Sequence, residues 1–312
     1  MKILPIPSRL TTAIFVFSLI ITSCKKEVSG DLSPQDEQQA NVIATQSDAE
    51  AESVFDGLFN DALGVNGDVA LGGTGIFGRS TAANYGYTDI NGRIDNTAQL
   101  PPCLNVSIEH SSNLFPVKVT LDFGSTGCTA NDGRWRTGKV IIIYSGRLVI
   151  PGSNATIKFE KYSIDSISVD NSSTYSITNT GTLDKPQFTV EVSAKLTKPN
   201  GNYSEWRSRK VITWVEGYLT TSSRIDDVLK IEGEASGKVK RNDVLVAWKA
   251  IINEPLIKKF TCRWISKGVV TTYRETLSAN SQWAGVLNYG QGNCDNYASL
   301  TINGQTFQIT LR

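Results

Sequence analysis

The chain has 312 residues, of which 31 are Lys or Arg and 30 are Asp or Glu, and it contains a single histidine, His110. One imidazole excludes a zinc site built from several histidines. The balanced charge also lacks the strong basic excess that is typical of nucleic-acid-binding domains.

The N-terminus has the pattern of an export signal. Lys2 and Arg9 precede an apolar run of 12 residues, Leu10–Ile21, which is followed by Thr22-Ser23-Cys24. A helix of this length rises about 18 Å, which is less than the ~30 Å core of a bilayer. The pattern therefore predicts a cleaved signal peptide over residues 1–23 and not a membrane-spanning anchor.

The end of this signal, Ile21-Thr22-Ser23-Cys24, resembles a bacterial lipobox. The resemblance implies cleavage before Cys24 and attachment of lipid to its thiol. We therefore expect a lipoprotein anchored in the cell envelope, at the outer membrane, on its periplasmic or its surface face. The alternative is an ordinary signal peptide in which the cysteine occurs by chance.

Removing residues 1–23, which hold Lys2 and Arg9, leaves 29 basic and 30 acidic side chains and a net charge of −1. Residues 25–70 hold two basic and ten acidic groups, so residues 71–312 hold 27 basic and 20 acidic ones. This mild excess favours anionic partners such as lipid headgroups or acidic glycans. Nucleic acid is not expected as a partner of an exported protein.

Three segments precede the body of the protein. Residues 24–46 are polar and predict a flexible tether. Residues 47–64 predict a short amphipathic helix, with Ser47 and Glu50 as a capping box and Val54 and Leu58 on its apolar stripe. Its expected role is packing on the body, and the alternative is a partner-binding helix. Residues 65–100 form a lead-in rich in Gly, Asn and Thr.

From residue 101 to 312 the pattern is that of β-structure. Apolar and polar residues alternate in Phe188–Leu196, Val244–Ile252 and Phe307–Leu311, and Asn303-Gly304 is a two-residue hairpin signal. Lys139–Tyr144 is apolar on both faces, which predicts a strand in the centre of the sheet. We expect an all-β fold, an antiparallel meander that forms a sandwich or an open barrel, in one unit or in two related lobes.

Four cysteines remain after Cys24: Cys103, Cys128, Cys262 and Cys294. An even number in an exported protein predicts two disulfides, and we expect Cys103–Cys128 and Cys262–Cys294, each joining two predicted strands, one of them Phe260–Trp264. Each would stabilise the fold by roughly 3–4 kcal/mol in the chain-entropy model. The alternative, a metal site of four thiolates, lacks the close cysteine pairs that such sites use.

Two of these cysteines end a repeated octet, LDFGSTGC at 121–128 and LNYGQGNC at 287–294. We interpret the octet as a structural device in which a strand ends, Gly124 or Gly290 breaks the pleat, and the cysteine ties the turn to a neighbouring strand. The functional alternative is a pair of equivalent ligand loops.

Two pairs of neighbouring aromatic and basic residues are candidate contacts for a glycan or an anionic surface: Trp135 with Arg136, and Trp206 with Arg207. The structural alternative is an amphipathic strand with Trp inward and Arg outward. No catalytic residue, metal ligand or cofactor is predicted, because His110 has no nucleophile elbow near it. A pair of carboxylates remains possible, and its candidates are Glu160, Asp165, Asp170, Glu191, Glu205, Glu216, Glu232 and Glu234.

The lipobox, the polar tether, the acidic helix and the cysteine-bearing β run together resemble a group of uncharacterised Bacteroidetes-type lipoproteins. The resemblance rests on the two octets, with Asp132-Gly133-Arg134 after the first and Asp295-Asn296 after the second. It implies no activity and no site residues. We expect a non-enzymatic binding or structural role. The alternatives are a glycan-processing hydrolase that uses paired carboxylates and a lipid carrier in a half-open barrel.

Overall fold

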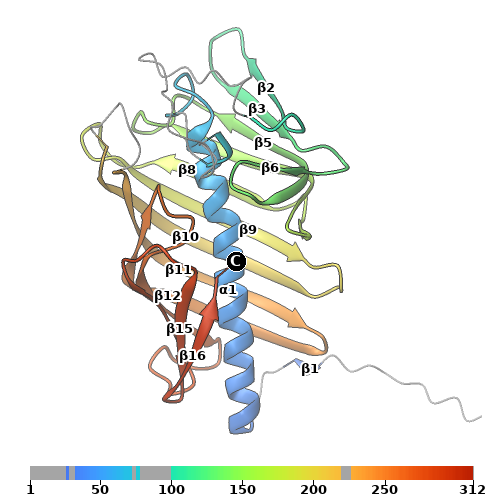
Figure 1. Cartoon of the computed structure of the whole chain (residues 1–312), viewed down its shortest axis with the longest axis vertical. Helices are drawn as coiled ribbons and strands as arrows, with labels where there is room; N and C mark the ends of the chain where they lie inside the picture. The colour runs from blue at the N-terminus through green and yellow to red at the C-terminus, as the bar shows by residue number, and fades with distance from the viewer. Residues whose placement is uncertain (1–25, 28–31, 72–74, 78–99, 219–225, 312) are drawn as a thin grey trace, which may run out of the picture.

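A computed structural model describes residues 26–27, 32–71, 75–77, 100–218 and 226–311 (Figure 1). The predicted signal peptide, Cys24 and most of the predicted lead-in lie outside these residues. The described chain contains an α-helix, a 3-10 turn and sixteen strands, and all of the strands belong to one sheet. The elements are β1 (Lys26–Glu27), α1 (Pro34–Gly64), η1 (Gly75–Phe77), β2 (Asn105–His110), β3 (Val117–Asp122), β4 (Cys128–Thr129), β5 (Trp135–Tyr144), β6 (Asn154–Ile164), β7 (Ile167–Val169), β8 (Thr174–Asn179), β9 (Gln187–Thr197), β10 (Tyr203–Glu216), β11 (Val228–Arg241), β12 (Val244–Lys259), β13 (Lys267–Arg274), β14 (Gly285–Gln291), β15 (Tyr297–Ile302) and β16 (Gln305–Thr310).

The prediction of an all-β, antiparallel meander is confirmed. The strand order runs from β16 to β2 with almost every strand beside its neighbours in sequence, and β7 and β8 share the place between β6 and β9. Fifteen strands pair in antiparallel fashion, and the two-residue β1 pairs with β12 in parallel. Each disulfide links segments in or next to strands of this one sheet, and the sheet curls around α1 (Figure 1).

Helix α1 is longer than predicted, because it has 31 residues and begins at Pro34, whereas the sequence predicted a tether up to residue 46 and a helix from Ser47. Its start has an N-cap: the Ser33 hydroxyl accepts a hydrogen bond from the Asp36 amide at 3.2 Å, and a proline follows the cap. The first three turns contain few apolar residues, so they carry no apolar stripe from which a helix would be predicted.

The sheet accommodates the helix with small side chains on its inner face. One register row across β10 to β13 consists of Ser208, Ala235, Ala250 and Thr272, which are all buried. Small side chains at these positions let the helix approach the sheet closely. The next row places Gly237 between two buried tryptophans, and a Cβ at Gly237 would lie 2.2 Å from the Glu205 carbonyl oxygen.

Both copies of the octet contain the same hydrogen bond between a glycine amide and the side chain two residues earlier. The Asp122 carboxylate accepts a hydrogen bond from the Gly124 amide at 2.9 Å, and the Asn288 side chain accepts one from the Gly290 amide at 2.8 Å. Gly124 and Gly290 have φ of 70° and 94°, which L-residues with a Cβ rarely adopt. In the first copy this bond follows the end of β3 at Asp122, whereas in the second it lies within β14, at an irregularity of the pairing with β13. The octet therefore repeats one Asx hydrogen bond, once at a strand end and once inside a strand.

The structure contains the disulfides Cys103–Cys128 and Cys262–Cys294, with Cα–Cα distances of 5.5 and 5.6 Å. Two strand predictions near them need correction. Phe260–Trp264 is not a strand, because β12 ends at Lys259 and the chain turns at Cys262. Lys139–Tyr144 lies in β5, which is third from the β2 end of the strand order and not at the centre of the sheet.

Candidate functional site

The interior between α1 and the sheet holds most of the buried ionisable groups. A polar stripe runs along the helix at intervals of three or four residues, and its side chains turn toward the sheet and not toward solvent. Its members are Glu37, Asn41, Thr45, Asp48, Glu52 and Asp56. Buried charges need partners, and the basic partners come from β10, β12 and β13.

Near the start of the helix, Glu37 binds Arg274 of β13. The Arg274 Nε and Nη2 atoms donate to the two Glu37 carboxylate oxygens at 3.0 and 2.8 Å. The side chains are 5% and 6% exposed, so this is a buried ion pair. Asn41 completes the network, because its amide nitrogen donates to Glu37 and its oxygen accepts from the Arg274 backbone amide, each at 3.0 Å.

In the middle of the helix, Asp48 and Glu52 lie on either side of Lys210 of β10. Glu52 forms an ion pair with Lys210, and the Asp48 carboxylate accepts a hydrogen bond from the Trp206 indole at 2.9 Å. Burial raises the pKa of Asp48. Burial also lowers the pKa of Lys210 to about 8, although the negative charge of Asp48 opposes this shift. One turn further along, Asp56 binds Lys258 of β12 at 2.8 Å.

At the C-terminal end of α1, Asp61 accepts a hydrogen bond from the Ile76 amide of η1 at 2.8 Å. Burial raises the pKa of Asp61 to about 7, and the nearby Arg136 opposes this shift. Arg136 is itself fully buried and donates to both carboxylate oxygens of Asp132, at 2.7 and 2.5 Å. Perturbed carboxylates of this kind often mark functional sites, but buried ion-pair networks perturb pKa values as well, and here the groups pair with one another.

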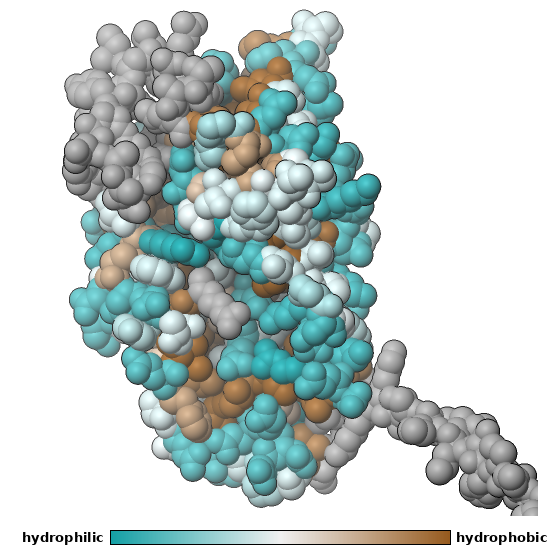
Figure 2. Space-filling view, turned by 45° about the vertical axis from the view of Figure 1, so that its right-hand side comes forward, coloured by the Kyte–Doolittle hydropathy of each residue, from teal (hydrophilic) through white to brown (hydrophobic). Residues whose placement is uncertain are grey.

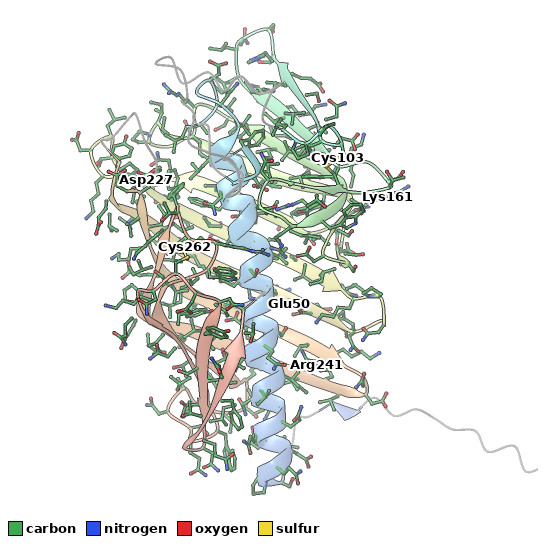
Figure 3. All side chains as sticks on the ribbon, viewed as in Figure 1. Glu50, Cys103, Lys161, Asp227, Arg241 and Cys262 are labelled. Atoms are coloured by element: carbon green, nitrogen blue, oxygen red, sulfur yellow. A yellow bond between two sulfur atoms is a disulfide. The ribbon has the colours of Figure 1, made fainter. Side chains whose placement is uncertain are left out.

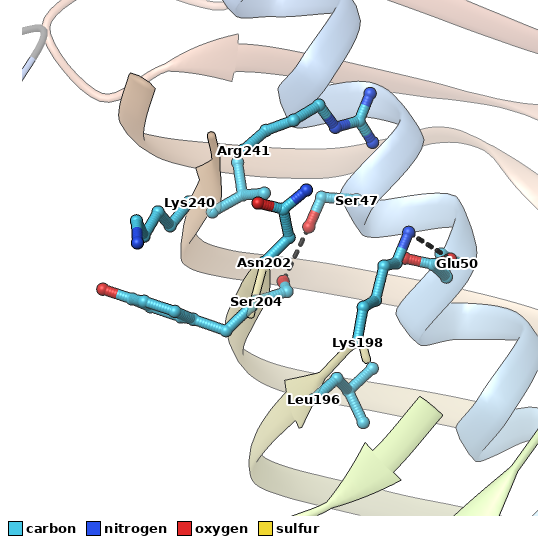
Figure 4. A pocket seen from close by; sticks show the side chains of 10 residues that line it. Ser47, Glu50, Leu196, Lys198, Asn202, Ser204, Lys240 and Arg241 are labelled. Carbon is cyan, nitrogen blue, oxygen red and sulfur yellow. Dashed lines mark hydrogen bonds and ion pairs between the residues drawn. The ribbon is translucent and has the colours of Figure 1, made fainter. Parts of the chain in front are cut away.

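A small hollow opens where the β9–β10 and β11–β12 turns meet α1 (Figure 4). It has a volume of about 20 Å³, which is room for roughly one water. Lys198 binds Glu50 at 2.8 Å, the hydroxyls of Ser47 and Ser204 are 2.6 Å apart, and Arg241 donates to Gln46 at 2.7 Å. In Figure 4, Lys240 points away from the helix whereas Arg241 reaches toward it. The hollow is too small to enclose a sugar ring, so its lining groups meet other molecules only at the surface.

The four residues predicted as a glycan or anion contact do not form one surface. Trp135 and Arg207 are exposed, whereas Arg136 is fully buried beside Phe123 and Trp206 is buried against Phe55. The β10 pair follows the amphipathic alternative, with Trp inward and Arg outward. The β5 pair has the opposite orientation, because Arg136 turns inward to bind Asp132.

The candidate catalytic carboxylates lie on β6, β9, β10 and β11 and in the turns on either side of β7, and seven of the eight are exposed. Several have basic partners: Glu191 binds Arg209 at 2.6 Å and Asp165 binds Arg134 at 2.7 Å. Among the residues that the structure describes, no three or more His, Cys, Asp or Glu side chains form a group that could hold a metal ion. Nor is any described helix long and apolar enough to span a membrane.

Sequence reasoning missed the paired acidic and basic groups of the interior. Glu37 falls within the predicted tether, and the sequence singles out neither Asp48 and Asp56 in the predicted helix nor Lys210, Lys258 and Arg274 in the body. The signal was present in the charge distribution, because ten acidic groups within residues 25–70 precede a body with 27 basic and 20 acidic groups.

Comparison of the chain with protein-family models, with curated proteins and with solved structures finds no match.

Proposed function

We propose that this chain is a lipid-anchored protein of the cell envelope, with a non-enzymatic binding or structural role. Two features support the location. The leader ends in the lipobox-like Ile21-Thr22-Ser23-Cys24, and the body carries two disulfides, which form and persist in oxidising compartments.

The observation that carries the non-enzymatic part of the proposal is the position of α1. The inner face of the curled sheet is the concave surface in which a substrate or a carried lipid would be held. This face is occupied by α1, which is fixed there by Arg274, Lys210 and Lys258 and by the stacking of Phe55 on Trp206. A carried lipid would have to displace the helix and leave these basic side chains without their carboxylates. Binding at the outer surface, to a protein or a glycan, requires no such rearrangement.

The anchor is tested with Cys24→Ala in the full chain. We expect the wild type to sediment with the envelope membranes and its intact mass to correspond to acylation of a mature chain that begins at Cys24. The variant should be released into the soluble fraction without the acyl mass. A wild type that carries no acyl group would contradict the anchor.

The role of the body is tested with a glycan array and a hydrolysis screen on the same purified protein. We expect any glycan that binds to be recovered intact. Sugar release that a single Glu→Gln change abolishes, for example at Glu205 or Glu234, would establish the hydrolase instead. Neither substitution alters a buried side chain, so loss of folding would not imitate loss of catalysis.

A further inference from the structure

Strand β1 fixes where the chain enters the sheet. Lys26 pairs with Val244 and Glu27 with Leu245, and the two strands run in the same direction. Strand β12 starts at the β11–β12 turn and runs away from it, so β1 also enters the sheet from the side of that turn. Cys24 is two residues before Lys26, and two residues span at most about 7–8 Å. The predicted anchor residue is therefore close to this turn.

Other turns lie at the same end of the sheet as the β11–β12 turn. One continuous register row crosses it through Ser163, Ser168, Thr197, Tyr203, Lys240, Leu245 and Glu27. Beyond this row lie the turns Asp165–Ser166, Lys198–Asn202 and Asn242–Asp243. Together with Arg241 at the end of β11, we call these turns the anchor rim. In Figures 1 and 3 it lies on the right-hand side of the molecule, on the side where β1 and Arg241 are labelled.

The anchor rim and the row beside it are polar and carry charges of both signs. The basic residues there are Lys195, Lys198, Lys240 and Arg241. The acidic residues are Glu50, which binds Lys198, Asp165, which binds Arg134, and Glu27, Glu205 and Asp243. The Lys195 ammonium lies over the Tyr203 ring at 4.6 Å, and Lys240 points outward. This side comes forward in Figure 2, where hydrophilic residues cover much of the surface and hydrophobic patches are smaller. Cationic side chains around a lipid-bearing residue suit the anionic headgroups of a phospholipid membrane.

From these observations we propose that the anchor rim rests on the membrane surface, so that the body is held against anionic phospholipid headgroups in one orientation. The inference rests on the proposed acylation of Cys24 and goes beyond it. A flexible tether of 23 residues, as predicted for residues 24–46, would leave the body free to turn. The β1–β12 pairing shortens the free connection to two residues and thereby selects one end of the sheet.

The orientation has a measurable consequence. The β8–β9 turn, which contains the exposed Asp184, lies at the other end of β9, an 11-residue strand. Eleven residues at about 3.3 Å each separate the two ends of β9 by roughly 35 Å, so in the proposed orientation this turn is further from the membrane than the anchor rim. Asn242, in the β11–β12 turn, is the matched position on the rim.

The experiment uses the acylated full chain in phosphatidylcholine vesicles that contain phosphatidylglycerol and a headgroup-labelled acceptor dye. A donor dye is attached through a bio-orthogonal amino acid at position 242 or 184, which leaves the cysteines intact. We expect energy transfer to be severalfold more efficient from position 242. Equal efficiency from the two positions in an acylated protein would contradict the proposed orientation but not the proposed acylation of Cys24. A protein whose intact mass shows no acyl group would defeat the anchor itself, and the orientation with it.

Two variants separate the contributions of geometry and charge. A 20-residue Gly/Ser insertion between Cys24 and Lys25 should bring the two efficiencies closer together, because such a linker reaches about 25 Å. Lys240→Glu should lower the transfer from position 242 in these anionic vesicles, whereas Lys249→Glu, on the outer face further from the rim, should not. If the insertion leaves the difference unchanged, the β1 connection does not set the orientation. If Lys240→Glu has no effect, the rim does not contact anionic headgroups.

Discussion

The two halves of α1 differ in their apolar contacts with the sheet, although buried ion pairs to the sheet occur in both. The C-terminal half, Ala51–Gly64, buries an apolar stripe that includes Phe55 and Leu58, and Phe55 stacks on Trp206 with ring centroids 5.2 Å apart. The N-terminal half, Pro34–Glu50, has no such stripe and is bound through Glu37 to Arg274, so we call it the ionic half. The pairs of Glu52 with Lys210 and of Asp56 with Lys258 lie in the C-terminal, apolar half. Both halves are largely buried, yet only one has the amphipathic pattern of a buried helix.

The comparison shows that a polar stripe on a helix does not by itself indicate that this face of the helix is exposed to solvent. A stripe of carboxylates can be buried when the opposing strands supply guanidinium and ammonium groups at matching positions. Such pairs add less net stability than apolar packing, since desolvation offsets much of their attraction, but removing one partner is costly. The apolar half is therefore expected to dominate stability, and the ionic half to depend on both partners being present.

The largest effect is expected in the apolar half. Phe55→Ala removes a ring that packs between Trp206 and Tyr175 and should lower the free energy of unfolding by about 3–5 kcal/mol. Urea denaturation measures this change. Gln39→Ala, at an exposed position of the same helix, is the control and should change stability by less than about 0.5 kcal/mol. A loss below about 1 kcal/mol for Phe55→Ala would mean that the apolar half does not hold the helix.

The ionic half is tested by breaking and then replacing its buried pair. Glu37→Gln leaves Arg274 buried without its carboxylate and should destabilise the protein by roughly 3 kcal/mol. Glu37→Leu combined with Arg274→Met removes both charges and should be much closer to the wild type. The comparison is made by denaturant unfolding at pH 7. A double variant that is less stable than Glu37→Gln would show that the pair stabilises the fold beyond an apolar replacement.

The end of the helix gives a pH-dependent prediction. Because burial raises the pKa of Asp61 to about 7, the folded protein holds this proton at pH values where the unfolded chain has released it. The contribution of Asp61 to stability therefore falls as the pH rises from about 4 to about 7, by up to a few kcal/mol at 1.4 kcal/mol per pKa unit.

Asp61→Asn keeps an oxygen for the Ile76 amide and removes the titration. The variant should gain stability relative to the wild type as the pH rises from 5 to 8, while Arg136 and Asp132 keep each other as partners. Thermal unfolding of both proteins across this range provides the measurement. Parallel stability profiles would show that Asp61 is not protonated in the folded protein below pH 7.

The smallest effect is expected for an ion pair outside the interior. Arg209 and Glu191 are 2.6 Å apart on the outer face of β10 and β9, with side chains 68% and 53% exposed. Arg209→Ala should change the free energy of unfolding by less than about 1 kcal/mol, because water and salt screen exposed pairs. An effect as large as that of Glu37→Gln would remove the distinction between buried and exposed pairs.

The sequence was a good guide where short-range rules apply. Strict alternation identified Phe188–Leu196 and Val244–Ile252 as strands, and Asn303-Gly304 forms the hairpin turn between β15 and β16. The two octets predicted strand ends at Gly124 and Gly290, and both glycines have positive φ. The prediction is correct for Gly124, which follows β3, and wrong for Gly290, which lies within β14. Alternation failed at Phe260–Trp264, where the chain turns before the disulfide to Cys294.

The sequence by itself determined the β class of the body, the repeated octet and the candidate anchor at Cys24, because each depends on residues that are near one another in the chain. Only the tertiary structure decided that the helix begins at Pro34, within the predicted tether, and that Glu37 and Asp48 are buried. The reason is physical: Glu37 and Arg274 are 237 residues apart, and neither side chain carries a local signal of the other. A charged residue is stable inside a protein only once its partner has been brought to it, and that is a property of the folded sheet.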